Sequence, residues 1–151
     1  MPSDQGLGPL DAVRSRTLLA VADRLIPTDE SGPGALPAGA AQYVGQALAG
    51  DYAALLPAYV AGLSSLDADA RERHGRGFAD LEPDDQDDML RALELGPSAP
   101  FFELVRRHVI EGMFGDPSYG GNRDRAGWAL LGYGGPQAVW TEPEQRIGEL
   151  A

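Results

Sequence analysis

The sequence predicts an all-α protein: one helical domain of about six helices, with a long segment rich in glycine and aromatic residues near the C-terminus. Apolar residues recur at helical spacing along most of the chain, and no stretch shows the strict alternation of a half-buried strand. At 151 residues the chain is long enough for one domain with a substantial core and too short for two. We expect a flexible N-terminus over residues 1–10, the helical domain over 11–140 and a C-terminal tail over 141–151.

The first predicted helix covers residues 11–26 and is stopped by Pro27. Its apolar stripe consists of Leu10, Val13, Leu18, Val21, Leu25 and Ile26. Residues 27–39 contain so many prolines and glycines that they are predicted to form a loop. Later helices are expected over residues 40–49, 52–66, 67–73, 82–95 and 98–113. Ser98 is a candidate N-cap for the last one, whose apolar face comprises Phe101, Phe102, Val105, Val109, Ile110 and Met113.

The composition excludes several kinds of chemistry. The chain has no cysteine, which rules out a disulfide framework, a thiolate nucleophile and an iron–sulfur cluster. It also has no lysine, so neither a Schiff base nor the lysine of a Walker A loop can form. With 12 arginines against 23 acidic residues the net charge is −11, which disfavours nucleic acids and anionic membranes. We therefore expect no nucleic-acid binding and no direct membrane insertion, and a protein or a neutral molecule as the partner.

The negative charge is concentrated in one part of the chain. Residues 67–94 contain ten acidic residues and four arginines, whereas residues 101–140 contain four of each and are neutral. This asymmetry is consistent with an acidic face in solvent and a separate surface made for close contact. Chance clustering of charge on a solubilising helix pair explains the pattern equally well, and both interpretations stay open.

Residues 114–136 differ from an ordinary connecting loop. Their 23 positions include seven glycines, two prolines, two tyrosines and a tryptophan, and Asn122 is the only asparagine in the chain. Glycine and asparagine tolerate positive φ angles, and aspartate before proline favours a turn. Long irregular segments in small domains are often functional, and aromatic residues are enriched at the centres of protein interfaces. We interpret this segment as an interface; alternatively, its aromatic residues cap the core and Asp116 ties a turn.

A specific pattern runs through this segment and the helix before it. It comprises Phe114-x-Asp116-Pro117-x-Tyr119-Gly120-Gly121-Asn122-Arg123-Asp124, Gly127-Trp128, Gly132-Tyr133, His108-x-x-Glu111-Gly112-Met113 and, more loosely, Leu18 to Pro27. The pattern resembles the signature of the gluconate 2-dehydrogenase subunit 3 family, and the similarity spans most of the chain.

The resemblance implies a non-catalytic small subunit that binds and stabilises or matures the catalytic subunit of a bacterial sugar, glycoside or sugar-acid dehydrogenase. The expected partner is a flavoprotein of the glucose–methanol–choline type, which holds FAD; some such complexes also carry a multihaem cytochrome c subunit. The chain lacks the glycine fingerprint of a dinucleotide site, so we expect no cofactor and no metal in it. The expected partner-interface residues are Asp116, Tyr119, Gly120, Gly121, Asn122, Arg123, Asp124, Trp128 and Tyr133. His108 and Glu111 are expected to brace this segment from the preceding helix.

Relatives of this kind often begin with a twin-arginine signal that exports the folded pair. No such signal is visible here: the apolar run from Leu18 to Ala22 is cut short by Asp23 and Arg24. We therefore expect a cytoplasmic protein as the sequence stands, or a periplasmic one if a signal was removed or if export occurs together with a partner.

Two other functions remain open. In the first, the chain is a stand-alone small enzyme or ligand-binding domain that uses His108, Glu111 and Asp116. His108 and Glu111 are three residues apart on one helical face and could ligate a metal ion if further ligands were near, although a hydrogen-bonded core histidine is the simpler interpretation. In the second, the chain is an export escort, and its partner stays active once the chain is removed.

Overall fold

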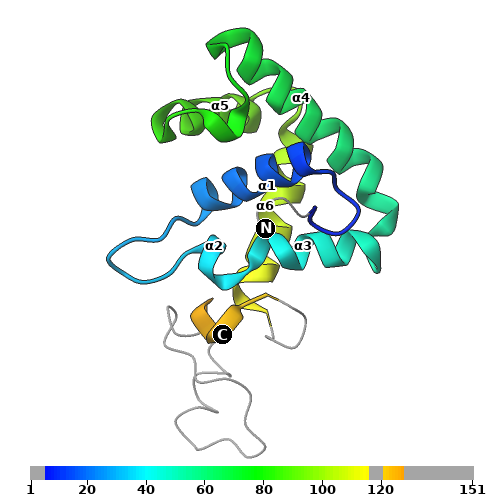
Figure 1. Ribbon diagram of the computed structural model, residues 1–151, viewed down its shortest axis with the longest axis vertical. Coiled ribbons are helices and arrows are strands. Elements are labelled where there is room, and N and C mark those ends of the chain that lie inside the picture. Colours follow the sequence, from blue (N-terminus) through cyan, green and yellow to red (C-terminus); the bar gives the residue numbers. More distant parts are fainter. Residues whose placement is uncertain (1–5, 116–120, 128–151) are drawn as a thin grey trace, which may run out of the picture.

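The computed structural model describes residues 6–115 and 121–127, and it confirms the all-α fold (Figure 1). Within these residues there is no β-strand, and an isolated bridge joins Asp29 and Gly32. The same residues contain no helix long and apolar enough to cross a bilayer. The α-helices are α1 (Ala12–Leu25), α2 (Ala35–Ala38), α3 (Ala40–Ala49), α4 (Leu56–His74), α5 (Pro83–Leu95) and α6 (Ala99–Phe114). Single 3₁₀ turns are η2 (Ala53–Leu55), η3 (Phe78–Asp80) and η5 (Arg123–Arg125).

Helix α6 lies at the centre of the molecule. It packs against α3 and α5 most extensively and also contacts α1, α2 and α4. Figure 1 shows α1 crossing α6, with α5 and the C-terminal end of α4 at one end of the molecule and η5 at the opposite end of α6. The face of α6 that enters the core consists of Phe102, Val105, Val109 and Met113, all buried. The arrangement therefore separates the acidic pair α4–α5 from the end of α6 that leads into residues 121–127.

Two residues assigned to the predicted apolar faces lie outside the core. Val13 of α1 has 49% of its surface exposed, and Ile110 of α6 has 36% exposed. A periodic stripe marks the direction of a buried face, but residues at its edge reach water when no neighbouring helix covers them.

Residues 6–10 contribute to the core, although the sequence places them in a flexible terminus. Leu7 and Leu10, placed by sequence in a flexible terminus, are buried in the core, and the backbone N–H of Leu7 donates to the Ser15 hydroxyl (2.7 Å). Leu7 also packs so closely on Gly45 of α3 that a Cβ there would approach the Leu7 backbone to 2.8 Å. Contacts with α3, which is distant in sequence, therefore hold these residues in place, and no local sequence pattern indicates such contacts.

Three helix predictions need correction. The predicted loop 27–39 contains the one-turn helix α2, whose Ala35 and Ala38 are fully buried. Residues 52–66 and 67–73 do not form two separate helices, because α4 is continuous from Leu56 to His74. Pro57 lies in its first turn, where a missing N–H breaks no helical hydrogen bond. Asp67 fits inside α4 because its carboxylate accepts hydrogen bonds from the Arg71 side chain and from the backbone N–H of Phe78. Ser98 occupies the N-cap position of α6, but its side chain makes no capping hydrogen bond.

Candidate functional site

His108 and Glu111 lie on α6 and bind tyrosines that come from three other parts of the fold. The Glu111 carboxylate accepts hydrogen bonds from Tyr52, just before η2 (2.7 Å), and from Tyr43 of α3 (3.1 Å). His108 Nδ1 forms a hydrogen bond of 2.7 Å with the Tyr59 hydroxyl of α4. Together these five residues, which we call the tyrosine–histidine cluster, connect α3, η2 and α4 to α6.

The imidazole of His108 packs against two aromatic rings, those of Tyr52 and Tyr59. Its ring stacks on Tyr52 with centroids 4.4 Å apart and planes within 10° of parallel, and it is 2% exposed. Tyr59, its hydrogen-bond partner, is completely buried. A polar ring in this position is stabilised because one face stacks on Tyr52 and one nitrogen atom has a hydrogen-bond partner inside the core.

The electrostatics of the cluster favour the neutral forms of His108 and of the three tyrosines. Burial lowers the pKa of His108; the Glu111 carboxylate opposes this shift and the Arg107 guanidinium adds to it. Burial raises the pKa of Tyr43 and of Tyr59, while the hydrogen bond to Glu111 is the main cause of the raised pKa of Tyr52. The tyrosine hydroxyls are therefore kept protonated, and those of Tyr43 and Tyr52 are in the form that donates hydrogen bonds to Glu111.

The chemistry available to the cluster is correspondingly limited. His108 and Glu111 already bind tyrosines, and His108 is closed to solvent. Throughout residues 6–115 and 121–127, no three His, Cys, Asp or Glu side chains are grouped in a way that could hold a metal ion. The arrangement is that of a structural polar network that fixes the position of α6.

Asn122 anchors the glycine-rich segment to the C-terminal end of α6. Its backbone N–H donates to the Gly112 carbonyl (2.6 Å) and its Nδ2 donates to the Gly115 carbonyl (2.7 Å). Its Oδ1 accepts a hydrogen bond from the backbone N–H of Gly127 (2.7 Å). Asn122 is fully buried and has a φ angle of 47°, which asparagine tolerates better than most residues. One side chain therefore holds both ends of residues 122–127 against α6.

Two glycines of this segment are required by close backbone contact. A Cβ at Gly121 would overlap the carbonyl oxygen of Gly112, and a Cβ at Gly127 would overlap that of Met113. Gly112 is itself confined, because a Cβ there would lie 2.9 Å from the Ala40 carbonyl oxygen. The spacing of glycine around Asn122 thus follows from backbone packed on backbone, which no larger residue permits.

Arg123 and Asp124 follow Asn122 and are exposed. The Arg123 guanidinium lies beside Gly39, where it would be 2.9 Å from a Cβ, and so the segment also contacts the junction of α2 and α3. Asp124 has a φ angle of 56°, and a positive φ at a non-glycine residue costs free energy. Strain at an exposed residue on a rigidly held turn is a recognised mark of a functional segment.

The structure divides the sequence-predicted site residues into three groups. The first group lies in residues 121–124. Its Gly121 and Asn122 are buried, and the Asn122 side chain makes its hydrogen bonds within the chain; Arg123 and Asp124 are exposed. His108 and Glu111 were expected to brace the segment, but their hydrogen bonds run to tyrosines; carbonyl groups of α6 and of Gly115 bind Asn122 instead. The remaining predicted residues, which lie outside the described part, are Asp116, Tyr119, Gly120, Trp128 and Tyr133.

Sequence reasoning missed the tyrosines that complete the cluster. Three of the five tyrosines of the chain, Tyr43, Tyr52 and Tyr59, fall within a single stretch of 17 residues. This clustering was a signal in the sequence that could have pointed to them. Their partners, however, lie 49 to 68 residues away in sequence, and no local pattern connects the two.

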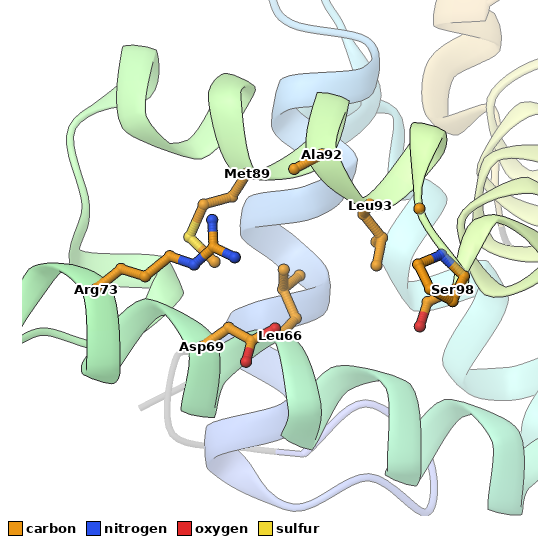
Figure 2. Close-up of a pocket in the computed structure, with 9 residues that line it drawn as sticks. Leu66, Asp69, Arg73, Met89, Ala92, Leu93 and Ser98 are labelled. Carbon is orange, nitrogen blue, oxygen red and sulfur yellow. The ribbon is translucent and has the colours of Figure 1, made fainter.

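A separate hollow lies between α4 and α5, away from the glycine-rich segment. Leu66, Met89 and Leu93 supply its apolar lining, and the charged side chains of Asp69 and Arg73 stand at its edge (Figure 2). Because α5 and η5 are at opposite ends of α6, this hollow is remote from Asn122 (Figure 1). It brings no histidine, hydroxyl pair or carboxylate pair together in an arrangement suited to catalysis.

One of three comparisons with known proteins gives a match. No curated protein and no solved structure matches the chain. The model of one protein family, described as gluconate 2-dehydrogenase subunit 3, matches residues 12–135, which include α1 to α6, the tyrosine–histidine cluster and the Asn122 anchor. The family is named after a subunit of a multi-subunit dehydrogenase, and the match covers far more than half of the 151 residues. The chain therefore belongs to the gluconate 2-dehydrogenase subunit 3 family.

Proposed function

We propose that this chain is a non-catalytic small subunit that binds the FAD-bearing catalytic subunit of a bacterial sugar, glycoside or sugar-acid dehydrogenase and stabilises or matures it. The observation that carries the proposal is the Asn122 anchor. Asn122 binds the end of α6 through the Gly112 and Gly115 carbonyls and closes the turn through the Gly127 N–H, while Arg123 and Asp124 stay exposed. A rigid turn that displays charged side chains loses little conformational entropy on binding, which favours a role in protein association.

The other residues support an accessory role in preference to independent catalysis. His108 and Glu111, the most obvious candidates for acid–base chemistry, are hydrogen-bonded to tyrosines, and burial lowers the pKa of His108. In this proposal FAD and the oxidation of the alcohol carbon belong to a partner of the glucose–methanol–choline type, and a cytochrome c subunit joins some complexes. The complex acts in the periplasm if it is exported, and in the cytoplasm otherwise.

Co-expression tests the proposal. The chain is expressed with a tagged FAD-bearing oxidoreductase encoded beside it, and the soluble yield, flavin content and dehydrogenase activity of the partner are measured. We expect co-purification, and a lower yield of active flavoprotein when the chain is omitted. Truncation of Arg123 to alanine should weaken association by about 2 kcal/mol, as expected for an interface hot spot. Arg91→Ala, which removes an exposed arginine from α5, is the matched control.

The results also separate the alternatives. An unchanged yield of active partner without the chain contradicts the stabilising role. A partner that stays active after the chain is removed, but is no longer exported, indicates an export escort. Stoichiometric binding of a metal ion or a sugar by the isolated chain would favour a ligand-binding domain built on His108 and Glu111.

A further inference from the structure

The outer face of α6 carries a shallow groove with an apolar floor. The groove follows the helix from Glu103 to Gly115, and its apolar side chains are Ile110 and Phe114. Ile110 is 36% exposed and Phe114 is half-buried, on a helix whose other face is packed in the core. An apolar strip between polar neighbours is typical of a surface that a partner covers.

The charged side chains that line the groove are two arginines and two glutamates, and both arginines, Arg106 and Arg107, are exposed to solvent. The nearest carboxylate to Arg106 is that of Glu103, at 3.6 Å, which is longer than the 2.8 Å contact between Arg24 and Asp87. Arg107 forms no ion pair with any residue that the structure describes, and the Glu111 carboxylate is hydrogen-bonded to tyrosines. Arg107, which has no ion pair within the described part of the chain, is therefore suited to pair with a carboxylate of a partner.

The groove is continuous with the Asn122 anchor. It ends at Gly115, whose carbonyl accepts the hydrogen bond from Asn122 Nδ2, and Gly127 approaches the Phe114 ring so closely that a Cβ there would lie 2.8 Å from it. The Gly115 end of the groove therefore lies beside η5, at the end of α6 opposite α5 (Figure 1).

We infer that this groove is where the catalytic subunit docks, through a segment that carries a large apolar side chain next to one or two carboxylates. The inference rests on the proposed function. The apolar side chain covers Ile110 and Phe114, and the carboxylates pair with Arg107 and Arg106. A basic side chain placed beside Arg107 would meet like charge and would be disfavoured there.

Two substitutions in the groove and two matched controls test the inference. Ile110→Asp places a charge in the apolar strip of the groove. Its control is Leu95→Asp, which introduces the same charge outside the groove, at a leucine of α5 that is 86% exposed. Arg107→Glu reverses a groove charge, and Arg76→Glu reverses an exposed arginine that follows α4. Circular dichroism and thermal unfolding establish that each variant is folded.

The affinity for the purified FAD-bearing subunit is then measured at several salt concentrations. We expect Ile110→Asp and Arg107→Glu to weaken binding by about tenfold or more, and the control variants to change it by less than about twofold. Binding of the unaltered chain should weaken as salt rises, and Arg107→Glu should reduce that dependence, because the screened attraction involves Arg107.

The outcomes distinguish this inference from the function on which it rests. If the groove variants bind normally while Arg123→Ala does not, the groove is not the docking surface and the proposed function stands. If salt strengthens binding, the docked segment is not acidic and the inference is overturned. If the unaltered chain does not bind at all, the proposed function fails together with the inference. If Ile110→Asp only abolishes a dimer of this chain, a second copy occupies the groove and the inference is wrong.

Discussion

The backbone N–H of Asn122 donates a hydrogen bond of 2.6 Å to the carbonyl of Gly112, inside the last turn of α6. This bond satisfies a carbonyl group near the C-terminal end of the helix, where carbonyl oxygens lack an intrahelical N–H donor or share one. Its short length depends on the missing Cβ of Gly121, which would otherwise overlap the same carbonyl oxygen. The glycine pair before Asn122 and the end of α6 are therefore one structural unit.

Replacement of Asn122 tests this unit. Asn122→Ala removes two side-chain hydrogen bonds and forces alanine to a φ of 47°, so we expect residues 121–127 to lose about 3 kcal/mol of local stability. Asn122→Gly removes the same bonds without the strain and should lose about 2 kcal/mol. The measurement is hydrogen exchange of the Gly127 amide, which donates to Asn122.

A matched change at the neighbouring position provides the control. Asp124→Gly relieves a positive φ of 56° at an exposed residue and should leave the Gly127 amide protected. Continued protection of that amide in Asn122→Ala would mean that the anchor depends on other contacts.

Gly112 offers a test in which helix propensity and packing predict opposite results. Alanine in place of glycine inside α6 should gain about 1 kcal/mol from helix propensity alone. A Cβ at this position, however, would lie 2.9 Å from both the Ala40 carbonyl oxygen and the Tyr43 ring. Because backbone cannot move aside cheaply, we expect Gly112→Ala to lower the free energy of unfolding by about 1–3 kcal/mol. Urea denaturation measures it, with Ser65→Ala on the exposed face of α4 as a propensity control that should be neutral or slightly stabilising.

Local signals predicted those parts of the fold that local physics determines. Helix α3 was expected at its observed bounds because Gly50 ends it, and α5 began where Pro83 and neighbouring acids favour a helix N-terminus. Helix α2 and the buried Leu7 depend on contacts with residues that are distant in sequence. A pattern read over a short stretch of sequence does not reveal such contacts.

The candidate site shows the same division. The glycine pattern around Asn122 indicated an unusual turn, and the turn is present. The partners of Glu111 could not be predicted, because Tyr43 and Tyr52 lie 68 and 59 residues away and reach it only when α3 and α6 pack together.

The ion pair between Arg24 and Asp87 should make stability depend on pH in strong acid. Its two contacts, 2.8 and 3.0 Å, join α1 to α5, and the hydrogen bond from Arg24 is the main reason that the pKa of Asp87 is lowered. A carboxylate with a lowered pKa in the folded state stabilises the fold above its ordinary value of about 4, and this contribution is lost as the pH falls below that value. Asp87→Asn should cost about 1 kcal/mol at neutral pH and less in acid.

The neighbouring aspartate gives the control for this prediction. Asp88 pairs with Arg91, and both side chains are largely exposed, so Asp88→Asn should change the free energy of unfolding little. Chemical denaturation at pH 7 and pH 3 measures both variants. Equal effects of the two substitutions would show that the Arg24–Asp87 pair contributes no more than a surface contact.

His108 should make stability depend on pH in a higher range. Its pKa is lowered by burial, although Glu111 opposes the shift and Arg107 adds to it. The unfolded chain therefore binds a proton at this residue more readily than the folded one. The stability is fully present above the ordinary histidine pKa of about 6.5 and falls as the pH drops below it towards the folded value. His108→Gln removes the titrating group, so the variant's stability should vary less between pH 7.5 and pH 5 than that of the unaltered chain.

A change in the hydrogen-bond partner separates titration from packing. Tyr59→Phe keeps the buried imidazole and removes only the hydroxyl that lies 2.7 Å from His108 Nδ1. It should lower the free energy of unfolding by about 1–2 kcal/mol at pH 7.5, because a buried nitrogen loses its partner, and should retain the loss of stability towards pH 5. Denaturation curves at both pH values measure the two effects. If His108→Gln and Tyr59→Phe keep the same pH dependence, a group other than His108 causes it, and the enclosed imidazole matters only for packing.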